Sequence, residues 1–260
     1  MGLSGKLTGR LRRAWLDRLP LDAVKSRLAR RRGVLTLCYH SLAPDLEDYP
    51  YRTDAAAFDA HVALLKQVSE ILPAGEAVRA LRERSARSRD RLVSVICFDD
   101  GYRDNWTEAT PILEKHDVPA TLFAARDLIR RGGDTHMDEA ELAALARHPL
   151  WRVGAHAVTH NVLTGYRRRE RIDEMQGCKD WLSDLLGRAP EGFAYPQGQL
   201  SVDIVELARA RFDHAFATDR RASRGFDAAQ IRRFCPTRRE DRLEAFARAL
   251  LLAPVEDGTA

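Results

Sequence analysis

The chain has 260 residues, of which 45% are apolar and 31% charged, and its net charge is +4. This length suits one domain with a terminal extension, and the apolar content is enough for one large core. No stretch approaches the roughly 18 apolar residues of a membrane-spanning helix, and the N-terminus lacks the apolar run of a secretory signal. We therefore expect a cytoplasmic protein, or one at the cytoplasmic face of a membrane.

The basic charge is concentrated at the N-terminus. Residues 1–32 hold ten Lys and Arg against Asp17 and Asp22, a local net of +8, which leaves −4 for the remainder of the +4 chain. Apolar side chains recur there every four residues, at Leu3, Leu7, Leu11, Trp15 and Leu19. This spacing predicts an amphipathic helix with a basic side.

Two roles are open for this N-terminal arm. Its basic side could lie on an anionic membrane surface, or the helix could pack across the bottom of the domain with its arginines in solvent. Vesicle binding by the full chain but not by a chain that starts at Gly33 would favour the first. We expect no nucleic-acid partner, because no base-reading motif accompanies the charge.

From residue 34 onward, short β-like runs alternate with amphipathic stretches. The predicted strands are Val34–Tyr39, Leu92–Phe98, Ala120–Ala124, Trp151–Ala155, Gly192–Tyr195, Ala215–Thr218 and Ile231–Cys235. The predicted helices are Phe58–Gln67, Glu108–His116, Glu139–Arg147, Glu170–Leu186 and Val202–Arg211. This alternation predicts βαβ units around a parallel sheet, and about seven strands suit a distorted (β/α) barrel. We expect the catalytic domain to span residues 33–253 and residues 254–260 to be a disordered tail.

The four cysteines are far apart and show no CxxC spacing. They are Cys38, Cys97, Cys178 and Cys235, and three of them lie in apolar runs. We expect buried free thiols rather than a metal or disulfide site.

Polar side chains follow the predicted strands where catalytic residues of parallel α/β folds collect. His40 follows the first strand, and Asp99 and Asp100 follow the second. Two adjacent carboxylates are costly to bury without partners, so they indicate either a functional pair or an ordinary turn that caps the next helix.

His156 and His160 follow a later strand and are four residues apart. Two histidines and one carboxylate form a common ligand set for catalytic zinc, with a position left open for water. Two unrelated surface histidines are the alternative. With the two aspartates, one carboxylate can hold the metal while the other acts as a base on the water that the metal acidifies. Hydrolysis of an amide or ester is the natural reaction class.

Three motifs in this order, FDDG, HxxxH after Gly154-Ala155, and FAYPxG, resemble those of the NodB-type polysaccharide deacetylases, a carbohydrate esterase family. The similarity runs from Tyr39 to about Arg233. It implies a distorted (β/α) barrel that uses zinc or another divalent ion to remove acetyl groups from N- or O-acetylated sugars. It assigns the general base to Asp99 and the metal ligands to Asp100, His156 and His160.

The third motif departs from the family pattern RPPYG. It reads Ala194-Tyr195-Pro196-Gln197-Gly198, without the arginine that orients the base or the later tyrosine. The backbone N–H of Gln197 can still serve an oxyanion. We expect substrate to bind at Tyr195, Pro196, Gln197 and Gly198.

The late histidine that supplies the general acid in the family is also missing from the stretch around residues 231–236. His40 and His214 are substitutes, and His40 is better placed at a strand end, although it could equally be a structural, hydrogen-bonded histidine. Arg232 and Arg233 either orient Asp99, contact an anionic substrate, or pair with other carboxylates.

The resulting hypothesis is a metal-dependent hydrolase that removes acetyl groups from a sugar, polysaccharide or glycan precursor. A metal- and sugar-binding module of the same fold and a metal hydrolase of another ester are the alternatives.

Overall fold

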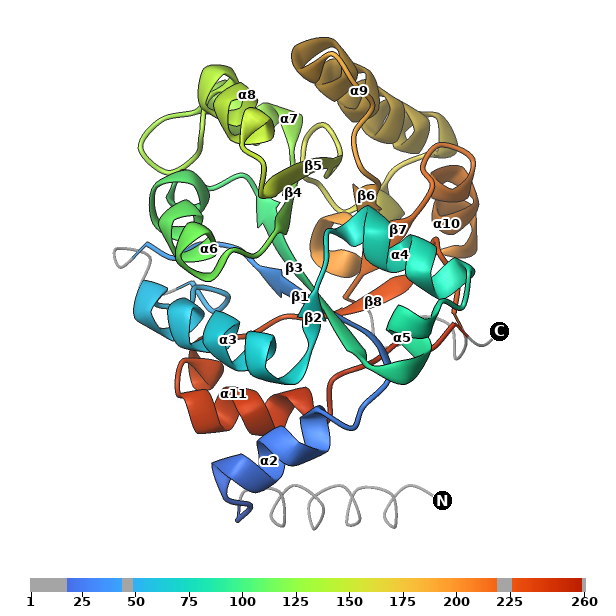
Figure 1. Cartoon of the computed structure of the whole chain (residues 1–260). Coiled ribbons are helices and arrows are strands. Elements are labelled where there is room, and N and C mark those ends of the chain that lie inside the picture. The colour runs from blue at the N-terminus through green and yellow to red at the C-terminus, as the bar shows by residue number, and fades with distance from the viewer. Residues whose placement is uncertain (1–17, 44–48, 219–225, 259–260) are drawn as a thin grey trace.

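The computed structural model describes residues 18–43, 49–218 and 226–258. Parallel strands lie at its centre with helices around them (Figure 1). In the order of their pairing the strands of the ring are β1 (Gly33–Tyr39), β3 (Leu92–Asp100), β4 (Ala120–Ala124), β5 (Trp151–Ala155), β6 (Phe193–Ala194), β7 (Ala215–Ala217) and β8 (Ile231–Phe234). Because β1 pairs with both β3 and β8, the ring closes. The short β2 (Glu70–Ile71) pairs with β3 outside the ring. The predicted distorted (β/α) barrel of about seven parallel strands is confirmed.

Helices cover the outside of the barrel. They are α2 (Leu21–Leu28), α3 (Ala55–Val68), α4 (Ala74–Arg82), α5 (Ala86–Asp90), α6 (Thr110–His116), α7 (Arg126–Arg131), α8 (Glu139–Arg147), α9 (Arg168–Leu186), α10 (Val202–Arg209) and α11 (Leu243–Leu250). One π-helical turn, η1 (Asn105–Ala109), and three 3₁₀ turns, η2 (Leu163–Gly165), η3 (Pro196–Gly198) and η4 (Arg238–Glu240), lie in the connections. Within the described residues, every helix is too short or too polar to cross a membrane.

The alternation of side chains along β3 determines which way Asp99, the candidate general base, points. Val93, Val95 and Cys97 belong to the apolar cluster inside the barrel, which also contains Phe123 and Phe216. Leu92, Ile96 and Phe98 on the opposite face of β3 belong instead to the larger cluster beneath the helices. Side chains of a strand alternate between its two faces, so Asp99 continues the inward row. By the same rule Arg233 follows the inward Ile231 on β8.

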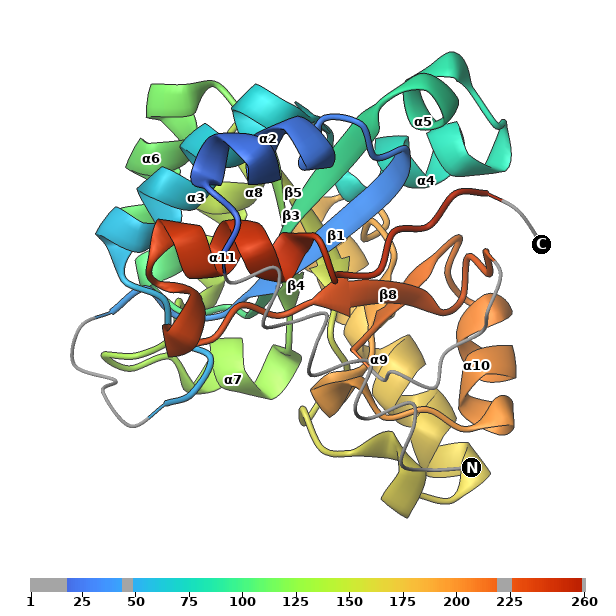
Figure 2. The ribbon, with the colours of Figure 1, turned by 90° about the horizontal axis from the view of Figure 1, so that it is seen from below.

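The described part of the N-terminal arm packs on the domain. Val24 and Leu28 of α2 are fully buried, and α2 lies alongside α3 and α11 (Figures 1 and 2). Arg31 donates hydrogen bonds to the carbonyl groups of Leu250 and Ala253. The packed body therefore extends N-terminal to residue 33. Residues 1–17, which carry most of the predicted basic helix, lie outside the described residues, so membrane contact stays a prediction.

The prediction of a disordered tail from residue 254 is wrong for the part that the structure describes. Backbone hydrogen bonds join Val34 to Glu256 in an antiparallel bridge, with N–O distances of 2.7 and 2.9 Å. The Glu256 side chain, which is buried, accepts a hydrogen bond from Arg232 at 2.8 Å. Pairing with the exposed start of β1 therefore orders this segment.

Candidate active site

The ends of three barrel strands bring the predicted catalytic residues together. Asp99 and Asp100 end β3, His156 directly follows β5, and His40 directly follows β1. Since all of these strands are parallel, their carboxyl ends meet at one rim of the barrel. Both aspartates are almost completely buried, at 3% and 4% exposure, so each needs a compensating partner.

Asp100, His156 and His160 converge on one point. Their candidate donor atoms all lie within 4.8 Å of one another, and Asp100 Oδ1 is 3.4 Å from His156 Nε2 and 3.0 Å from His160 Nε2. That buried oxygen nevertheless receives no hydrogen bond of acceptable geometry among the described residues. Two imidazoles and a carboxylate therefore point at a common centre without satisfying the hydrogen-bonding capacity of the carboxylate. This arrangement fits a divalent ion such as zinc.

The orientation of His156 supports the same conclusion. Its Nδ1 lies 2.7 Å from the carbonyl oxygen of Ala194, which only accepts hydrogen bonds. In the neutral ring Nδ1 therefore carries the proton, and the lone pair of Nε2 faces Asp100. A carbonyl partner on the far nitrogen commonly orients a metal-binding histidine.

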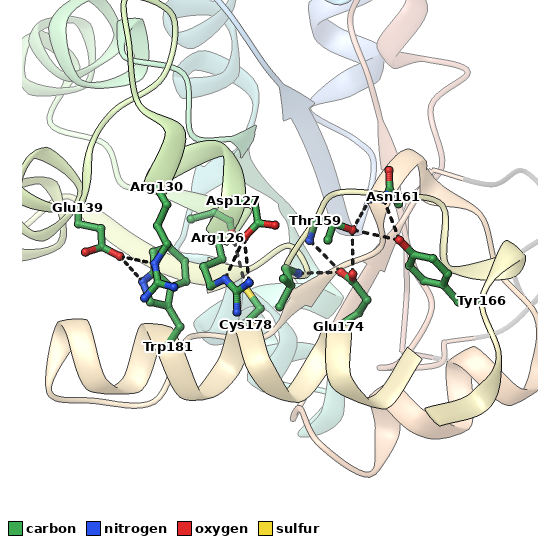
Figure 3. Close-up of polar contacts among 12 residues, drawn as sticks. Arg126, Asp127, Arg130, Glu139, Thr159, Asn161, Tyr166, Glu174, Cys178 and Trp181 are labelled. Carbon is green, nitrogen blue, oxygen red and sulfur yellow. Dashed lines mark hydrogen bonds and ion pairs between the residues drawn. The ribbon is translucent and has the colours of Figure 1, made fainter. Parts of the chain in front are cut away.

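The loop that carries the histidines needs external support. Ala157 and His160 both have left-handed backbone conformations, with φ of 65° and 64°, which cost non-glycine residues on the order of 1–2 kcal/mol each. Glu174 of α9 lies beneath this loop (Figure 3). Its carboxylate accepts hydrogen bonds from the backbone N–H groups of Val158 and Thr159, both at 2.9 Å, and from the Thr159 hydroxyl at 2.8 Å.

The rest of the inner face of α9 fixes the helix to its neighbours. Trp181 donates to Glu139 at 2.7 Å, and Arg130 of α7 donates to the same carboxylate at 2.9 Å. These contacts appear at the other end of the helix in Figure 3. Glu174 thus connects the loop that carries the two candidate metal-binding histidines to a helix that is itself anchored to α7 and α8.

Asp99 forms a two-pronged ion pair with Arg233. Both guanidinium–carboxylate distances are 2.7 Å, and the Arg233 side chain is 1% exposed. Burial is the largest single effect and would raise the pKa of Asp99, but the charge and hydrogen bonds of Arg233, together with His156 and His40, outweigh it and lower that pKa to about 2. Of the alternatives for this arginine, orientation of Asp99 is the one found. Arg232 turns the other way to Glu256. An arginine of β8 therefore occupies the role that the altered third motif leaves open.

The structure separates the two candidates for the general acid. One ring nitrogen of His40 lies within 4.8 Å of the Asp99 carboxylate, and its buried Nδ1 has no hydrogen-bond partner among the described residues. Burial lowers the pKa of His40, while the Asp100 and Asp99 charges act in the opposite direction. His214 precedes β7 and so lies at the opposite end of the barrel, where burial lowers its pKa to about 4.

The loop after β6 exposes only one of its four predicted substrate-binding residues. Tyr195, Pro196 and Gly198 are buried, and the Tyr195 hydroxyl donates to the Ala229 carbonyl at 2.7 Å. The Tyr195 N–H bonds to Phe216 and the Gly198 N–H to Tyr195. Gln197 is exposed with a φ of 54°. Among the four predicted residues, the N–H of Gln197 is therefore the backbone donor that remains available to a ligand.

The prediction of buried free thiols is confirmed for three of the four cysteines, and Cys235 is half-buried. All four thiols are free, and Cys38, Cys97 and Cys178 are buried. Cys38 lies in the inward row of β1, and its Sγ is 3.3 Å from Asp99 Oδ2.

Fold and site together define a parallel α/β barrel with a candidate metal centre and an ionised carboxylate beside it. The sequence model of the family described as polysaccharide deacetylase matches residues 86–211, which include Asp99, Asp100, His156 and His160. This match confirms the resemblance to the polysaccharide deacetylase family over just under half of the chain.

Two curated relatives share modest identity with the chain. The protein YxkH of Bacillus subtilis, described as a candidate polysaccharide deacetylase, is 27% identical over 66% of this chain and 59% of its own length. The peptidoglycan-N-acetylglucosamine deacetylase of Bacillus cereus is 28% identical over 53% of this chain and 50% of its own length. The chain thus matches only about half to three fifths of these relatives.

Solved structures agree on the fold. The Streptococcus pyogenes deacetylase PplD, in complex with acetate, superposes with a TM-score of 0.74 at 20% identity, over 85% of this chain and 99% of that protein. IcaB from Ammonifex degensii gives a TM-score of 0.71 at 22% identity, over 84% and 98% of the two chains.

The support from Glu174 can be tested by substitution. Glu174→Ala leaves the buried N–H of Val158 and the partly buried N–H of Thr159 without an acceptor, at up to about 1–3 kcal/mol each, so the loop should loosen and zinc affinity should fall about 10–100-fold. Glu174→Gln retains an acceptor oxygen and should stay near the parent. Calorimetric zinc titration measures both variants. The exposed Asp184→Ala on the same helix is the control, and unchanged affinity in Glu174→Ala would contradict the role.

The Arg233–Asp99 pair predicts a specific pH effect. With Arg233 present, the Asp99 pKa of about 2 lies below the unfolded value, so the pair stabilises the fold above about pH 4 and this contribution is lost as the pH falls towards 2. Arg233→Met leaves a buried, unpaired carboxylate. We expect a loss of about 3–5 kcal/mol in unfolding free energy near pH 7 and a markedly smaller loss near pH 2.

Unfolding by denaturant at both pH values measures this difference. Arg233→Lys keeps the charge but not the planar two-pronged geometry, and we expect an intermediate loss. Equal losses at both pH values in Arg233→Met would show that the arginine contributes packing rather than charge.

Proposed function

We propose that this protein is a metal-dependent hydrolase that removes acetyl groups, on nitrogen or oxygen, from a sugar, polysaccharide or glycan precursor. The observation that carries the proposal is the position of an ionised carboxylate, Asp99, against a three-donor metal cluster at the barrel rim. Asp99 Oδ2 lies 3.7 Å from Nε2 of His156, one of the three candidate ligands. The family match and the curated deacetylase relatives supply the reaction class.

Asp100, His156 and His160 would hold zinc or another divalent ion. Such an ion polarises the acetyl carbonyl and lowers the pKa of the attacking water. Asp99 accepts the proton of that water, and Arg233 keeps the carboxylate ionised and aligned. A carboxylate with a pKa of about 2 is a weak base, so its action depends on water that is already acidified.

Two further groups complete the assignment. The exposed N–H of Gln197 donates to the oxygen that becomes negative when water attacks the acetyl carbonyl. His40, which has a partner-free Nδ1 and one ring nitrogen within 4.8 Å of the Asp99 carboxylate, hands a proton to the departing sugar nitrogen or oxygen. Its lowered pKa makes it neutral at rest, so it takes that proton from Asp99 during the reaction rather than from solvent beforehand.

The alternative of a non-catalytic binding module has less support from the geometry. Holding a metal and a sugar requires Asp100 and the histidines, but it gives no role to a buried arginine fixed on Asp99. A metal hydrolase of another ester would use the same residues, and identification of acetate as the product distinguishes it.

Two substitutions should separate catalysis from metal binding. Asp99→Asn should keep zinc, because its ligands are untouched, and should lose acetate release by on the order of 10²–10⁴-fold. His156→Ala should lose most of the zinc, because three protein ligands fall to two.

The measurements are zinc content by elemental analysis and acetate release from N-acetylated and O-acetylated oligosaccharides, with thermal unfolding as the check on folding. Near-parent activity in Asp99→Asn would remove Asp99 as the base. Full zinc content in His156→Ala would remove the proposed ligand set.

A further inference from the structure

Three of the four cysteines of the chain lie in one layer of the barrel. Strands β8, β1 and β3 are neighbours in that order (Figure 1). Cys38 of β1 is in register with Cys97 of β3. The pairing of β1 with β8 places Leu37 opposite Phe234, so the next residue of each segment, Cys38 and Cys235, also stand opposite each other.

The three side chains point into the barrel. Cys97 belongs to the apolar cluster inside it, as do Val34 at the start of β1 and Ile231 at the start of β8. Side chains of a strand alternate between its faces, so Cys38 shares the face of Val34 and Cys235 shares the face of Ile231. Cys235, Cys38 and Cys97 therefore form a row across three adjacent segments.

Cys38 and Cys235 are suited to form a disulfide. Their thiols are in hydrogen-bonding contact. Neighbouring strands lie about 4.7–4.9 Å apart, and the Cα atoms of disulfide-bonded cysteines lie about 4.4–6.8 Å apart. Rotation of the two side chains can therefore join the sulfur atoms without a rearrangement of the strands.

The three thiols differ in their access to solvent. Cys235 is partly exposed and directly follows β8, at the rim that carries the candidate catalytic residues. Cys38 and Cys97 are completely buried. Burial, followed by the hydrogen bond with Cys235, raises the pKa of Cys38, and burial also raises the pKa of Cys97. A reagent from solvent therefore meets Cys235 first, and Cys38 is the thiol beside it.

This pair of thiols lies against the proposed base. The Cys38 thiol donates to Asp99 Oδ2 at 3.3 Å. Cys235 follows Arg233 by two residues, and the Arg233 guanidinium holds the same carboxylate. A disulfide between the two cysteines removes the S–H donor from Asp99 and ties the residue after β8 to β1 beside the arginine.

We propose that Cys38 and Cys235 form a reactive dithiol that low-molecular-weight disulfides oxidise, and that the resulting bond lowers the activity of the adjacent site. Formation of the bond is independent of the proposed deacetylase function, whereas its effect on activity rests on that function. The metal ligands Asp100, His156 and His160 take no part in the reaction, so metal content should not change.

The reaction is a pair of thiol–disulfide exchanges. The Cys235 sulfur attacks one sulfur of the small disulfide, which forms a mixed disulfide and releases one small thiolate. The Cys38 sulfur then attacks the Cys235 sulfur, and a second small thiolate leaves. The protons of the two protein thiols end on the two released thiolates. Two electrons pass from the protein to the reagent, so a reducing dithiol reverses the reaction.

The bond is tested by counting thiols. Zinc-loaded protein is treated with oxidised glutathione, and free thiols are counted after denaturation, with peptide mapping to locate any link. The four free thiols should fall to two, with Cys38 linked to Cys235. Cys235→Ser should keep its three thiols, whereas the matched control Cys97→Ala should still lose two. Thermal unfolding checks that each variant is folded.

Three results would overturn the proposed pair. They are a link between Cys38 and Cys97, a full set of free thiols after treatment, and glutathione that stays on Cys235 without a link.

The effect on the site is tested by two readouts. Acetate release should fall about tenfold or more on oxidation, because hydrogen bonds to charged groups contribute on that order, and dithiothreitol should restore it. The carboxyl carbon resonance of Asp99, assigned by comparison with Asp99→Asn, should move on oxidation and return on reduction. Cys235→Ser should have parent-like activity that oxidised glutathione does not change. An unmoved resonance or full activity in the linked protein would overturn the effect.

These measurements separate the two hypotheses. Acetate release by the reduced enzyme without formation of the link removes the dithiol and keeps the deacetylase. A link that moves the Asp99 resonance, in a protein that releases acetate from no acetylated glycan when reduced, removes the deacetylase and keeps the dithiol.

Discussion

The burial of two adjacent carboxylates is the constraint on which the site depends. Asp99 and Asp100 are 3% and 4% exposed, and neither can remain charged there without a partner. The fold supplies a different partner to each. Arg233 neutralises Asp99 from inside the barrel, while two imidazoles approach Asp100 from the loop after β5. This difference favours different roles for the two residues, because Asp99 is paired with an arginine that keeps it ionised, whereas Asp100 is left open to a cation.

The position of Arg233 shows how a motif can change while its physical task is kept. The loop after β6 lacks the arginine that family members place there, yet the guanidinium arrives from β8. Strand β8 pairs with β1, and β1 pairs with β3, so an inward side chain on β8 can cross the barrel interior to Asp99. The guanidinium also lies over the Phe123 ring, 5.7 Å from its centroid. What the buried carboxylate needs is a cation beside it, from whichever strand can provide one.

The sequence was sufficient for the barrel and for the metal cluster because both have local signals. Each ring strand is an apolar run between turns, and all were located within about two residues. The aspartate pair and the two histidines stand at strand ends, where parallel topology brings them together. Arg233 also carried a signal, since it lies two residues after the inward Ile231 and shares its face.

Other parts of the structure had no comparable signal. The C-terminal segment is ordered by a bridge between Glu256 and Val34 of β1. These two residues are 222 positions apart in the sequence. Tyr49 and Tyr51, whose rings contact His40, lie in no helix or strand themselves, so no periodic pattern marks them. Glu174 was missed although it is a buried acidic residue one turn before Cys178 in the buried stripe of α9. A charged residue in such a stripe is costly without partners, and this cost would have marked it as functional.

The central claim, that Asp100, His156 and His160 hold a metal while Asp99 remains free to act as a base, is tested most directly by anomalous diffraction at the zinc edge. Crystals grown with zinc should show one peak about 2.0–2.2 Å from a donor atom of each of the three ligands, with Asp99 still paired to Arg233. The structure offers a competing group of donors, Cys38, His40 and Asp99. A peak there, or direct coordination of zinc by Asp99, would contradict the account.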